Sequence, residues 1–386
     1  MTDLHVVDAT AEHVDEIVAV IHHAFAARRT LDPPSTALEE NASTVGEAVA
    51  TYGGLLVRID GEPAGAMLFE VSGDVLGLRR VSVDPRFQGR GVASALVGCA
   101  EDAARARGLR RVRLIARVEL PDTVEFWRRR GYSVVAREGQ DLIYAKAMPV
   151  FLTVPTADDM RAIAEELAGQ LRAGDVLVLS GDLGAGKTTF TQGLGAGLKV
   201  RGDITSPTFV ISRVHPSLSG GPALVHVDAY RLGGFAELDD LDLDASLEEA
   251  VTVVEWGQGL AESLAPDRLD IVVTRGDNDT DETRALRITP AGPRWAEVGI
   301  HLTAPAQPAG DTPTESAAEG VASAQPAADR GAGLPSAPAS ASAAEGRAMR
   351  EAAPGACSPS TAPPSSSASA AGGGAMRSSD AGLELS

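Results

Sequence analysis

The chain has 386 residues and a formal net charge of −19, and 44% of its residues are hydrophobic. This length predicts two or more domains with sizeable cores. The charge argues against a chain that by itself binds nucleic acid tightly, because phosphate contacts need a basic face, but it does not exclude a local basic patch. No apolar run approaches the roughly 18 residues of a membrane span, and the acidic N-terminus lacks the basic region of a signal peptide. We therefore expect a cytoplasmic protein with no membrane association.

Composition divides the chain into three zones, which we expect to be separate structural units. Residues 1–149 and 150–300 both mix strand and helix patterns. Residues 301–386 consist mostly of Ala, Pro, Ser, Gly and Glu, with almost no aromatic residues. Such a segment cannot bury enough apolar surface to offset the entropy of ordering it. We therefore predict a disordered C-terminal tail.

The first zone begins with a predicted strand at residues 4–8. A helix follows, because Val14, Ile17, Val18 and Ile21 repeat with the helical period. A hairpin is predicted over residues 54–70, with its turn at Gly61, Glu62 and Pro63. The next predicted elements are a strand, a helix, a strand and a helix, over residues 78–83, 96–106, 111–116 and 123–130.

A glycine turn joins the strand at residues 78–83 to the next helix. Its spacing is R/Q-x-x-G-x-G/A, and a later motif, EFWRRRGY, covers residues 125–132. A glycine turn between a strand and a helix N-terminus surrounds an anion with backbone N–H groups. Together the two motifs resemble the GNAT N-acetyltransferase family, whose turn binds the pyrophosphate of acetyl-CoA. The resemblance implies a mixed sheet with flanking helices and acetyl-CoA contacts at Val81, Val83, Arg86, Gln88, Gly89, Arg90, Gly91, Val92 and Ala93.

The chain departs from that family where the chemistry takes place. Many GNAT proteins have an Asn before the last helix and a Tyr within it as general acid, where this chain has Leu120 and Trp127. An indole N–H does not give up its proton at neutral pH. Tyr132 or Glu119 could replace the acid, and Glu70 could help as a base. An active acetyltransferase of unknown acceptor and a domain that binds acetyl-CoA or nothing both remain open.

The second zone is organised around a glycine-rich stretch. A short strand at residues 153–156 and a helix at 160–171 come first, with Thr156 as the predicted N-cap. An apolar strand at residues 176–179 then leads into the glycine-rich stretch, and an Ala/Gly/Leu-rich segment that can be helical follows it. We expect Gly195 and Gly197 to interrupt that helical pattern.

The stretch Gly181-x-x-x-x-Gly186-Lys187-Thr188 has the pattern of a P-loop. A buried strand, a glycine turn and a helix N-terminus place consecutive backbone N–H groups around a β-phosphate. Lys187 would reach the β- and γ-phosphates, and the Thr188 hydroxyl would hold Mg²⁺. The only lysines of the chain are Lys146, Lys187 and Lys199, so one stands where a compact ammonium is wanted. The alternative is a glycine-rich turn that binds nothing.

Two later strands, at residues 223–227 and 251–254, each end in an acid, Asp228 and Glu255. In P-loop folds, carboxylates at such strand ends hold Mg²⁺ or position water. The alternative is a pair of solvated acids. Before these strands, residues 206–209 (SPTF) would form a loop that senses a γ-phosphate. Between them, the acidic residues 235–250 are predicted to form a solvated helix or lid.

The P-loop, SPTF, HVDAYR and VEW, in this order, resemble the TsaE-type ATPase of bacterial tRNA threonylcarbamoyladenosine (t6A) synthesis. The resemblance implies that the chain binds ATP and Mg²⁺, hydrolyses ATP slowly and acts with TsaB and TsaD, which modify the tRNA. It implies catalytic roles for Asp228, Lys187 and Glu255, with Thr188 and Glu255 as Mg²⁺ ligands. The implied ATP contacts are Gly181, Asp182, Leu183, Gly184, Ala185, Gly186, Lys187, Thr188, Thr189, Thr156 and Trp256.

The two resemblances together predict an α/β protein. A GNAT mixed sheet with flanking helices would be followed by a P-loop NTPase α/β sheet domain and the disordered tail. The predicted function is an ATPase of t6A synthesis fused to an acetyltransferase. The alternative is a nucleotide-dependent interaction switch with a degenerate GNAT domain. A small-molecule kinase is a weaker interpretation, because an acidic lid disfavours an anionic substrate.

Overall fold

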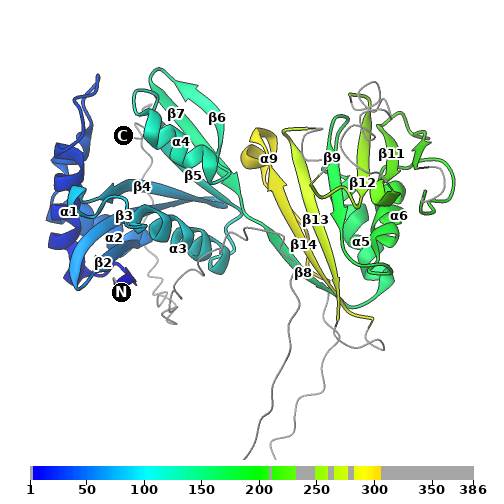
Figure 1. The fold of residues 1–386 in the computed structure, drawn as a ribbon, viewed down its shortest axis with the longest axis horizontal. Helices are drawn as coiled ribbons and strands as arrows, with labels where there is room; N and C mark the ends of the chain where they lie inside the picture. Colours follow the sequence, from blue (N-terminus) through cyan, green and yellow to red (C-terminus); the bar gives the residue numbers. More distant parts are fainter. Residues whose placement is uncertain (1–2, 208–210, 232–247, 260–264, 277–281, 306–386) are drawn as a thin grey trace, which may run out of the picture. The chain divides into compact units, whose positions relative to one another are not determined.

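The computed structural model describes residues 3–207, 211–231, 248–259, 265–276 and 282–305. Within these ranges the chain forms two seven-stranded sheets, each with its own helices (Figure 1). The predicted α/β class is therefore confirmed. Three predictions lie outside the described residues in whole or in large part: the tail, the end of the SPTF loop and most of the acidic stretch at 235–250.

The first sheet has the strand order β1-β2-β3-β4-β5-β7-β6. Strands β4 and β5 are parallel, and the other neighbours are antiparallel, so the sheet is mixed as predicted. Its strands are β1 Leu4–Asp8, β2 Gly54–Ile59, β3 Glu62–Ser72, β4 Val75–Val83, β5 Arg111–Arg117, β6 Ser133–Glu138 and β7 Asp141–Ala147.

The hairpin of β2 and β3 is confirmed, but its predicted turn is displaced. Asp60 and Gly61 both have positive φ, 51° and 85°, and β3 already begins at Glu62. Two consecutive residues with positive φ match the twist of the flanking strands, so Asp-Gly makes the tight connection. Pro63 lies in the strand, as the second residue of β3.

Helices cover both faces of the first sheet (Figure 1). On one face, α1 (Val14–Ala26) and α2 (Ala42–Tyr52) pack against Leu56 and Leu68. On the other, α3 (Val92–Ala106) and α4 (Pro121–Arg129) join a core with Met67 and Phe69. Successive side chains of β3 point to opposite faces of the sheet, so this strand contributes to both cores. Short 3₁₀ turns lie at Ala11–His13, Thr36–Glu39, Pro85–Phe87 and Ala229–Arg231.

The second sheet has the strand order β10-β11-β12-β9-β13-β14-β8. Its centre, β11-β12-β9-β13, is parallel, and the outer strands are antiparallel. The carboxyl ends of β9, β11 and β12 therefore share one edge. The strands are β8 Val150–Val154, β9 Val176–Ser180, β10 Ser212–His215, β11 Ala223–Asp228, β12 Ala250–Glu255, β13 Arg268–Arg275 and β14 Arg284–Ala291.

Helices α5 (Ala157–Ala168) and α6 (Lys187–Gly197) pack against each other on one face of this sheet (Figure 1). The predicted interruption at Gly195 is wrong, because α6 continues to Gly197. A Cβ at Gly193 would lie 2.3 Å from the carbonyl oxygen of Arg161 in α5, and one at Gly195 would lie 2.0 Å from Cδ1 of Ile204. These glycines therefore serve close packing rather than helix termination.

Other element boundaries differ only slightly from the predictions. Helix α5 ends at Ala168, before the predicted residue 171, and begins just after the predicted cap at Thr156. The last helix of the chain's described part is α9 (Pro293–Val298). None of the described helices combines the length and apolar character that a membrane crossing requires.

Candidate nucleotide and coenzyme sites

The P-loop backbone leaves β9 and enters α6 through positions that require glycine. Gly181 has a φ of 144°, and a Cβ there would lie 2.3 Å from the carbonyl oxygen of Val273. Gly186, with a φ of 111°, directly precedes α6. Between them, the Leu183 side chain is 85% exposed at the tip of the loop, and Ala185 is buried. The backbone of the loop, rather than its side chains, therefore lines the space at the N-terminus of α6.

Lys187 is the first residue of α6, and its side chain turns back over the loop. The Nζ group donates hydrogen bonds to the carbonyl oxygens of Gly181 (2.8 Å) and Asp182 (3.0 Å). It also lies 3.9 Å from the ring centroid of Trp256. Burial lowers the pKa of the Lys187 ammonium, while the nearby carboxylates of Glu255 and Asp228 oppose that shift. The Lys187 ammonium is therefore held over the loop, where the oxygens of a bound phosphate would lie.

Thr188 meets Glu255 of β12 in the first turn of α6. Its hydroxyl donates to Oε1 of Glu255 at 3.2 Å. The Nε2 atom of His226, in β11, lies 2.9 Å from the same oxygen. The side chain of Glu255 is 4% exposed and that of His226 is fully buried. The sequence motif HVDAYR contains His226, but the motif alone indicates no role for this residue.

Asp228 ends β11 directly beside Glu255 in the parallel register. Its Oδ2 accepts a hydrogen bond from the Ser206 hydroxyl at 3.3 Å, and its Oδ1 accepts one from the backbone N–H of Tyr230 at 3.1 Å. The carboxylate is buried. Parallel pairing thus brings the two predicted acids together, and we call Lys187, Thr188, Asp228 and Glu255 the strand-end cluster.

Trp256 follows Glu255 with a positive φ of 61°. Its backbone N–H donates to the carbonyl oxygen of Leu179 in β9, at 2.9 Å. Its ring lies 5.3 Å from that of Tyr230, which is 67% exposed. A bulky residue at positive φ is uncommon and costs conformational energy. The backbone bond to β9 and the contact with Lys187 hold Trp256 beside the P-loop.

Thr156 has a structural role in this state. Its hydroxyl accepts from the backbone N–H of Asp159 at 3.1 Å, and the Asp159 carboxylate accepts from the Thr156 hydroxyl and backbone N–H. This capping box starts α5, as the N-cap prediction required. Thr189 is also a predicted ATP contact. It is half-buried in the first turn of α6.

The donor set of the strand-end cluster fits Mg²⁺. One hydroxyl and one carboxylate meet at Thr188 and Glu255. In the part of the chain that is described, no group of three or more His, Cys, Asp or Glu side chains is arranged to hold a metal ion. Mg²⁺ in nucleotide sites typically takes one or two protein oxygens and completes its shell with phosphates and water. Thr188 and Glu255 are therefore suitable protein ligands for it.

The glycine turn before α3 is open on its outer side. Gly89 and Gly91 have positive φ values of 74° and 83°, and Gly91 is the N-cap of α3. A Cβ at either position would have no described atom within 4 Å. Val81 and Val83 are half-buried in β4, Val92 is buried in the first turn of α3, and Gln88 is exposed. The backbone could therefore approach a ligand closely here.

Strand β4 separates from β5 just before this turn. The two strands pair only from Val75 with Arg111 to Leu78 with Leu114. The β3–β4 register then shifts between Ala66 and Leu68, and Arg80 has a positive φ of 52°. A bulge of this kind bends the strand and leaves its groups unpaired on one side. The end of β4 therefore does not pair with β5 beside the glycine turn, although it still pairs with β3 and the carbonyl oxygen of Val81 accepts a hydrogen bond from Arg28.

The basic side chains of this turn contact acids within the protein. Arg86 donates from Nε and Nη2 to Asp84, each at 3.1 Å, and lies 3.2 Å from Glu62. Arg90 lies 3.5 Å from Asp60. The hydrogen bonds from Arg86 lower the pKa of the buried Asp84 carboxyl to about 2. Arg86 thus stiffens the turn in addition to carrying a positive charge there.

Most of the side chains at the positions where GNAT chemistry is expected are buried or contact other side chains of the protein. Trp127 is 3% exposed, and the Tyr132 hydroxyl donates to Oε1 of Glu101 in α3 at 3.1 Å. Burial raises the pKa of Tyr132 well above its ordinary value. Glu119 accepts from Arg117 at 2.9 Å, and Glu70 lies 4.0 Å from Arg79. Leu120 is the N-cap of α4. None of these contacts singles out a general acid.

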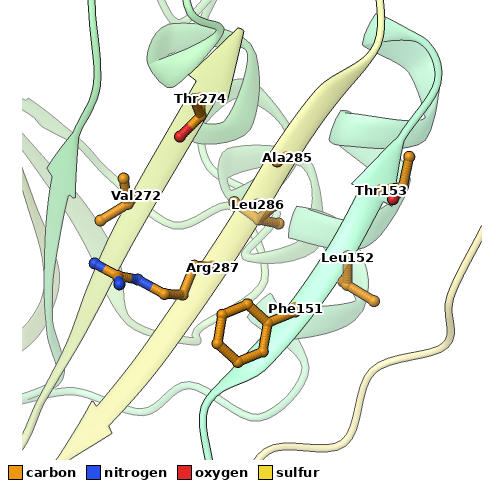
Figure 2. A pocket seen from close by; sticks show the side chains of 8 residues that line it. All are labelled: Phe151, Leu152, Thr153, Val272, Thr274, Ala285, Leu286 and Arg287. Atoms are coloured by element: carbon orange, nitrogen blue, oxygen red, sulfur yellow. The ribbon is translucent and has the colours of Figure 1, made fainter. Parts of the chain in front are cut away.

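A hollow of about 420 Å³ lies over β8, β13 and β14 (Figure 2). Figure 2 shows Phe151, Arg287 and Val272 on the same face of three adjacent strands, and the strand register pairs them directly. No residue of the P-loop or of the strand-end cluster lines it. This hollow is therefore separate from the predicted nucleotide site.

Comparison with known families gives two separate matches. The model described as threonylcarbamoyl adenosine biosynthesis protein TsaE matches residues 154–285, and that of the acetyltransferase (GNAT) family matches residues 19–132. The tRNA threonylcarbamoyladenosine biosynthesis protein TsaE of Streptomyces coelicolor is 58% identical over 147 residues, which are 38% of this chain and 99% of that protein. The Bacillus subtilis protein of the same name is 40% identical, covering 36% of this chain and 84% of its own length.

Solved structures match each half of the chain. The crystal structure of YdiB from Bacillus subtilis has a TM-score of 0.32 and 34% identity, over 38% of this chain and 88% of its own. The ribosomal-protein-S18-alanine N-acetyltransferase of Escherichia coli has a TM-score of 0.32 and 16% identity, over 38% of this chain and 94% of its own. The family models and the relatives confirm both resemblances stated from the motifs.

Proposed function

Because this chain belongs to the TsaE family of threonylcarbamoyl adenosine biosynthesis proteins, we propose that it binds ATP with Mg²⁺ and hydrolyses it in t6A modification of tRNA. The observation that carries this proposal is the strand-end cluster. Lys187 and Thr188, at the start of α6, meet Glu255 from β12, far away in the sequence, beside a glycine loop at one edge of the sheet. That arrangement suits phosphoryl transfer, which needs positioning and charge stabilisation.

In this proposal each group has a distinct task. The backbone of residues 181–189 holds the phosphates, and Lys187 exchanges its bonds to Gly181 and Asp182 for bonds to phosphate oxygens. Thr188 and Glu255 hold Mg²⁺, which neutralises charge that develops on the phosphates. Asp228 orients the attacking water, because its carboxylate lies beside Glu255 and is fixed by Ser206 and Tyr230. Trp256 packs near the nucleotide.

The proposed partners are TsaB and TsaD, with tRNA reached only through them. The net charge of −19 supports this division, because a chain of that charge is repelled by polyphosphate. The proposed domain limits are 1–149 for the GNAT part and 150–300 for the TsaE part. The separate hydrophobic clusters of the two sheets support a boundary between Ala147 and Val150.

For the GNAT part we propose acetyl-CoA binding at the turn before α3 and transfer to an unidentified amine. The open space in front of Gly89 and Gly91 supports binding. The Tyr132 hydroxyl donates to Glu101, so it is a poor candidate for the acid that protonates the leaving thiolate. Transfer would then depend on positioning and on proton exchange with water.

A nucleotide-dependent switch is the second candidate. The hydrogen bond from Ser206 to Asp228 favours it, because it links the loop that follows α6 to an acid of the strand-end cluster. Loss or gain of a γ-phosphate contact could then move that loop. In this version hydrolysis only resets the docking state, and the GNAT part is non-catalytic.

The test is ATP turnover by the full chain alone and with TsaB and TsaD, for the wild type and Asp228→Asn. The ATPase proposal predicts turnover stimulated by the partners, a loss of about 100-fold in Asp228→Asn and nearly unchanged ATP affinity. The switch predicts that ATP promotes the complex more than ADP does and that Asp228→Asn still assembles it. If the partners do not stimulate ATP turnover and ATP does not promote assembly of the complex, both candidates are wrong.

A further inference from the structure

A fully buried histidine contacts the Glu255 carboxylate of the strand-end cluster. His226 lies in β11, two residues before Asp228, and pairs with Val253 in β12. Its neighbour on the same face of β11, Leu224, belongs to the apolar core. An imidazole inside such a core loses hydration, so it needs a strong compensating contact. Among the described residues, the ring makes a single hydrogen bond, between Nε2 and Oε1 of Glu255 at 2.9 Å.

Two donors converge on one oxygen of Glu255. His226 approaches Oε1 at 2.9 Å and the Thr188 hydroxyl approaches it at 3.2 Å. A carboxylate accepts both bonds, which makes Nε2 the protonated ring nitrogen. Since Oε1 holds two donors, Oε2 remains available to a cation. The Thr188 hydroxyl gives its proton to Oε1 and keeps its lone pairs for the same cation.

We infer that His226 is a positioning residue for Mg²⁺: it fixes the Glu255 carboxylate so that Oε2 and the Thr188 hydroxyl oxygen face one cation. This inference rests on the proposed function, which assigns Mg²⁺ to Thr188 and Glu255. A glutamate side chain has three rotatable torsions, and a bond from a rigid, buried ring removes most of that freedom. Partners that orient metal ligands in this way commonly change metal affinity by about 10- to 100-fold when they are removed.

The other ring nitrogen argues against a purely structural histidine. Among the described residues Nδ1 of His226 is buried and has no hydrogen-bond partner. A buried polar atom without a partner destabilises the folded state. An apolar side chain would avoid that cost at this position, so packing alone does not account for an imidazole. The bond from Nε2 to Glu255 does account for it.

The chain offers a matched comparison of reach. In His226→Gln the side-chain amide nitrogen can occupy nearly the position of Nε2, whereas in His226→Asn it reaches only the position of Nδ1. Both variants place an amide in the same core, so both carry a similar burial cost. His215→Asn is the control, because His215 is also buried, in neighbouring β10, and contacts the Arg201 carbonyl oxygen rather than Glu255.

The experiment measures binding of a non-hydrolysable ATP analogue, AMP-PNP, to the full chain by calorimetry across a Mg²⁺ titration and in EDTA. We expect His226→Asn to raise the half-saturating Mg²⁺ concentration about tenfold or more, with AMP-PNP affinity in EDTA unchanged. His226→Gln and His215→Asn should remain close to the wild type. Thermal unfolding of each variant shows whether the fold is intact.

Three outcomes in the histidine variants overturn the inference. His226→Asn with a normal Mg²⁺ titration would remove any role for the ring, and equal losses in His226→Gln and His226→Asn would reduce the ring to packing. A loss in His215→Asn as large as that in His226→Asn would mean that any buried histidine in this region acts alike. Glu255→Gln tests the underlying proposal separately: if it leaves the Mg²⁺ titration unchanged, the assignment of Mg²⁺ to Glu255 fails and the inference fails with it.

Discussion

The P-loop and the turn before α3 are both glycine turns between a strand and a helix, and they differ in what surrounds them. At the P-loop, side chains from α6, β11 and β12 converge on one point. At the turn before α3, Arg86 and Arg90 contact acids of their own neighbourhood, and open space lies in front of the glycines. The first site thus has charged side chains aimed inward, whereas the second offers mainly backbone.

Sheet topology explains the difference. The second sheet has four adjacent parallel strands, so several carboxyl ends meet at one edge. The first sheet has one parallel pair, β4 and β5, and its pairing stops after Leu78. The acids that meet Arg86 and Arg90 at that turn come from the turn itself and from the β2–β3 hairpin rather than from neighbouring carboxyl ends of parallel strands. A similar local backbone supports a side-chain-rich site in one sheet and a backbone-based site in the other.

The largest expected effect is at Lys187. Lys187→Gln removes the buried ammonium and should weaken ATP binding about 100-fold, because a charge-assisted bond to phosphate contributes up to about 3 kcal/mol. The matched control is Lys199→Gln, which removes an exposed lysine after α6 and should change the affinity by no more than about twofold. Calorimetry with ATP and Mg²⁺ measures both. Equal losses in the two variants would contradict a specific role for Lys187.

The helical glycines give the second test. Gly193→Ala places a Cβ 2.3 Å from the Arg161 carbonyl oxygen, so it should destabilise the TsaE part by about 2 kcal/mol. Gly98→Ala in α3 meets no described atom within 4 Å and should stabilise the GNAT part by about 0.5–1 kcal/mol. Scanning calorimetry measures both shifts. Stabilisation by both variants would mean that α5 and α6 do not pack closely.

The third test concerns the backbone-based site. Gly91→Val adds a side chain at a φ of 83°, in the open space before α3. We expect acetyl-CoA affinity to fall about tenfold, because the added methyl groups occupy the approach to the helix N-terminus. ATP affinity should not change, and Lys187→Gln should in turn leave acetyl-CoA binding intact. An unchanged acetyl-CoA affinity in Gly91→Val would contradict a coenzyme site at this turn.

The smallest effect is the pH dependence at Asp84. Its carboxyl has a pKa of about 2 in the folded chain, below the ordinary value, chiefly because of hydrogen bonds from Arg86. The ionised group therefore stabilises the fold fully above about pH 4, and this contribution is lost as the pH falls toward 2. Asp84→Asn should cost about 1 kcal/mol at pH 7, since Arg86 is partly exposed and screened.

Denaturant unfolding of wild type and Asp84→Asn at several pH values checks this expectation. The difference in unfolding free energy should be largest near neutral pH and should shrink below about pH 4. A difference that grew on acidification would have the wrong sign for a carboxyl with a lowered pKa.

Local patterns predicted the P-loop, both strand-end acids and the glycine turn, because each depends on a few consecutive residues. The motif orders also identified both families. The helix α2 was not predicted: Val45 and Val49 form its buried face, but they and its threonines are β-branched and have low helix propensity. Its start did carry a signal: Asn41 and Thr44 form a capping box.

Contacts between distant residues could not be predicted from sequence. The bond from His226 to Glu255 spans 29 positions and depends on the register of β11 with β12. Gly195 signalled a helix end by composition, but α6 continues through it to Gly197 because Gly195 packs against Ile204. In both cases tertiary contacts decided the role of a residue whose local sequence was ambiguous.

We propose that the strand-end cluster supplies the ATPase step of t6A synthesis. The most direct measurement is the t6A content of bulk tRNA, by mass spectrometry, in cells whose only TsaE-family gene encodes the Lys187→Gln chain. We expect t6A to be largely lost in these cells and to be retained in cells that carry Lys199→Gln. Normal t6A in the Lys187→Gln cells would contradict the claim.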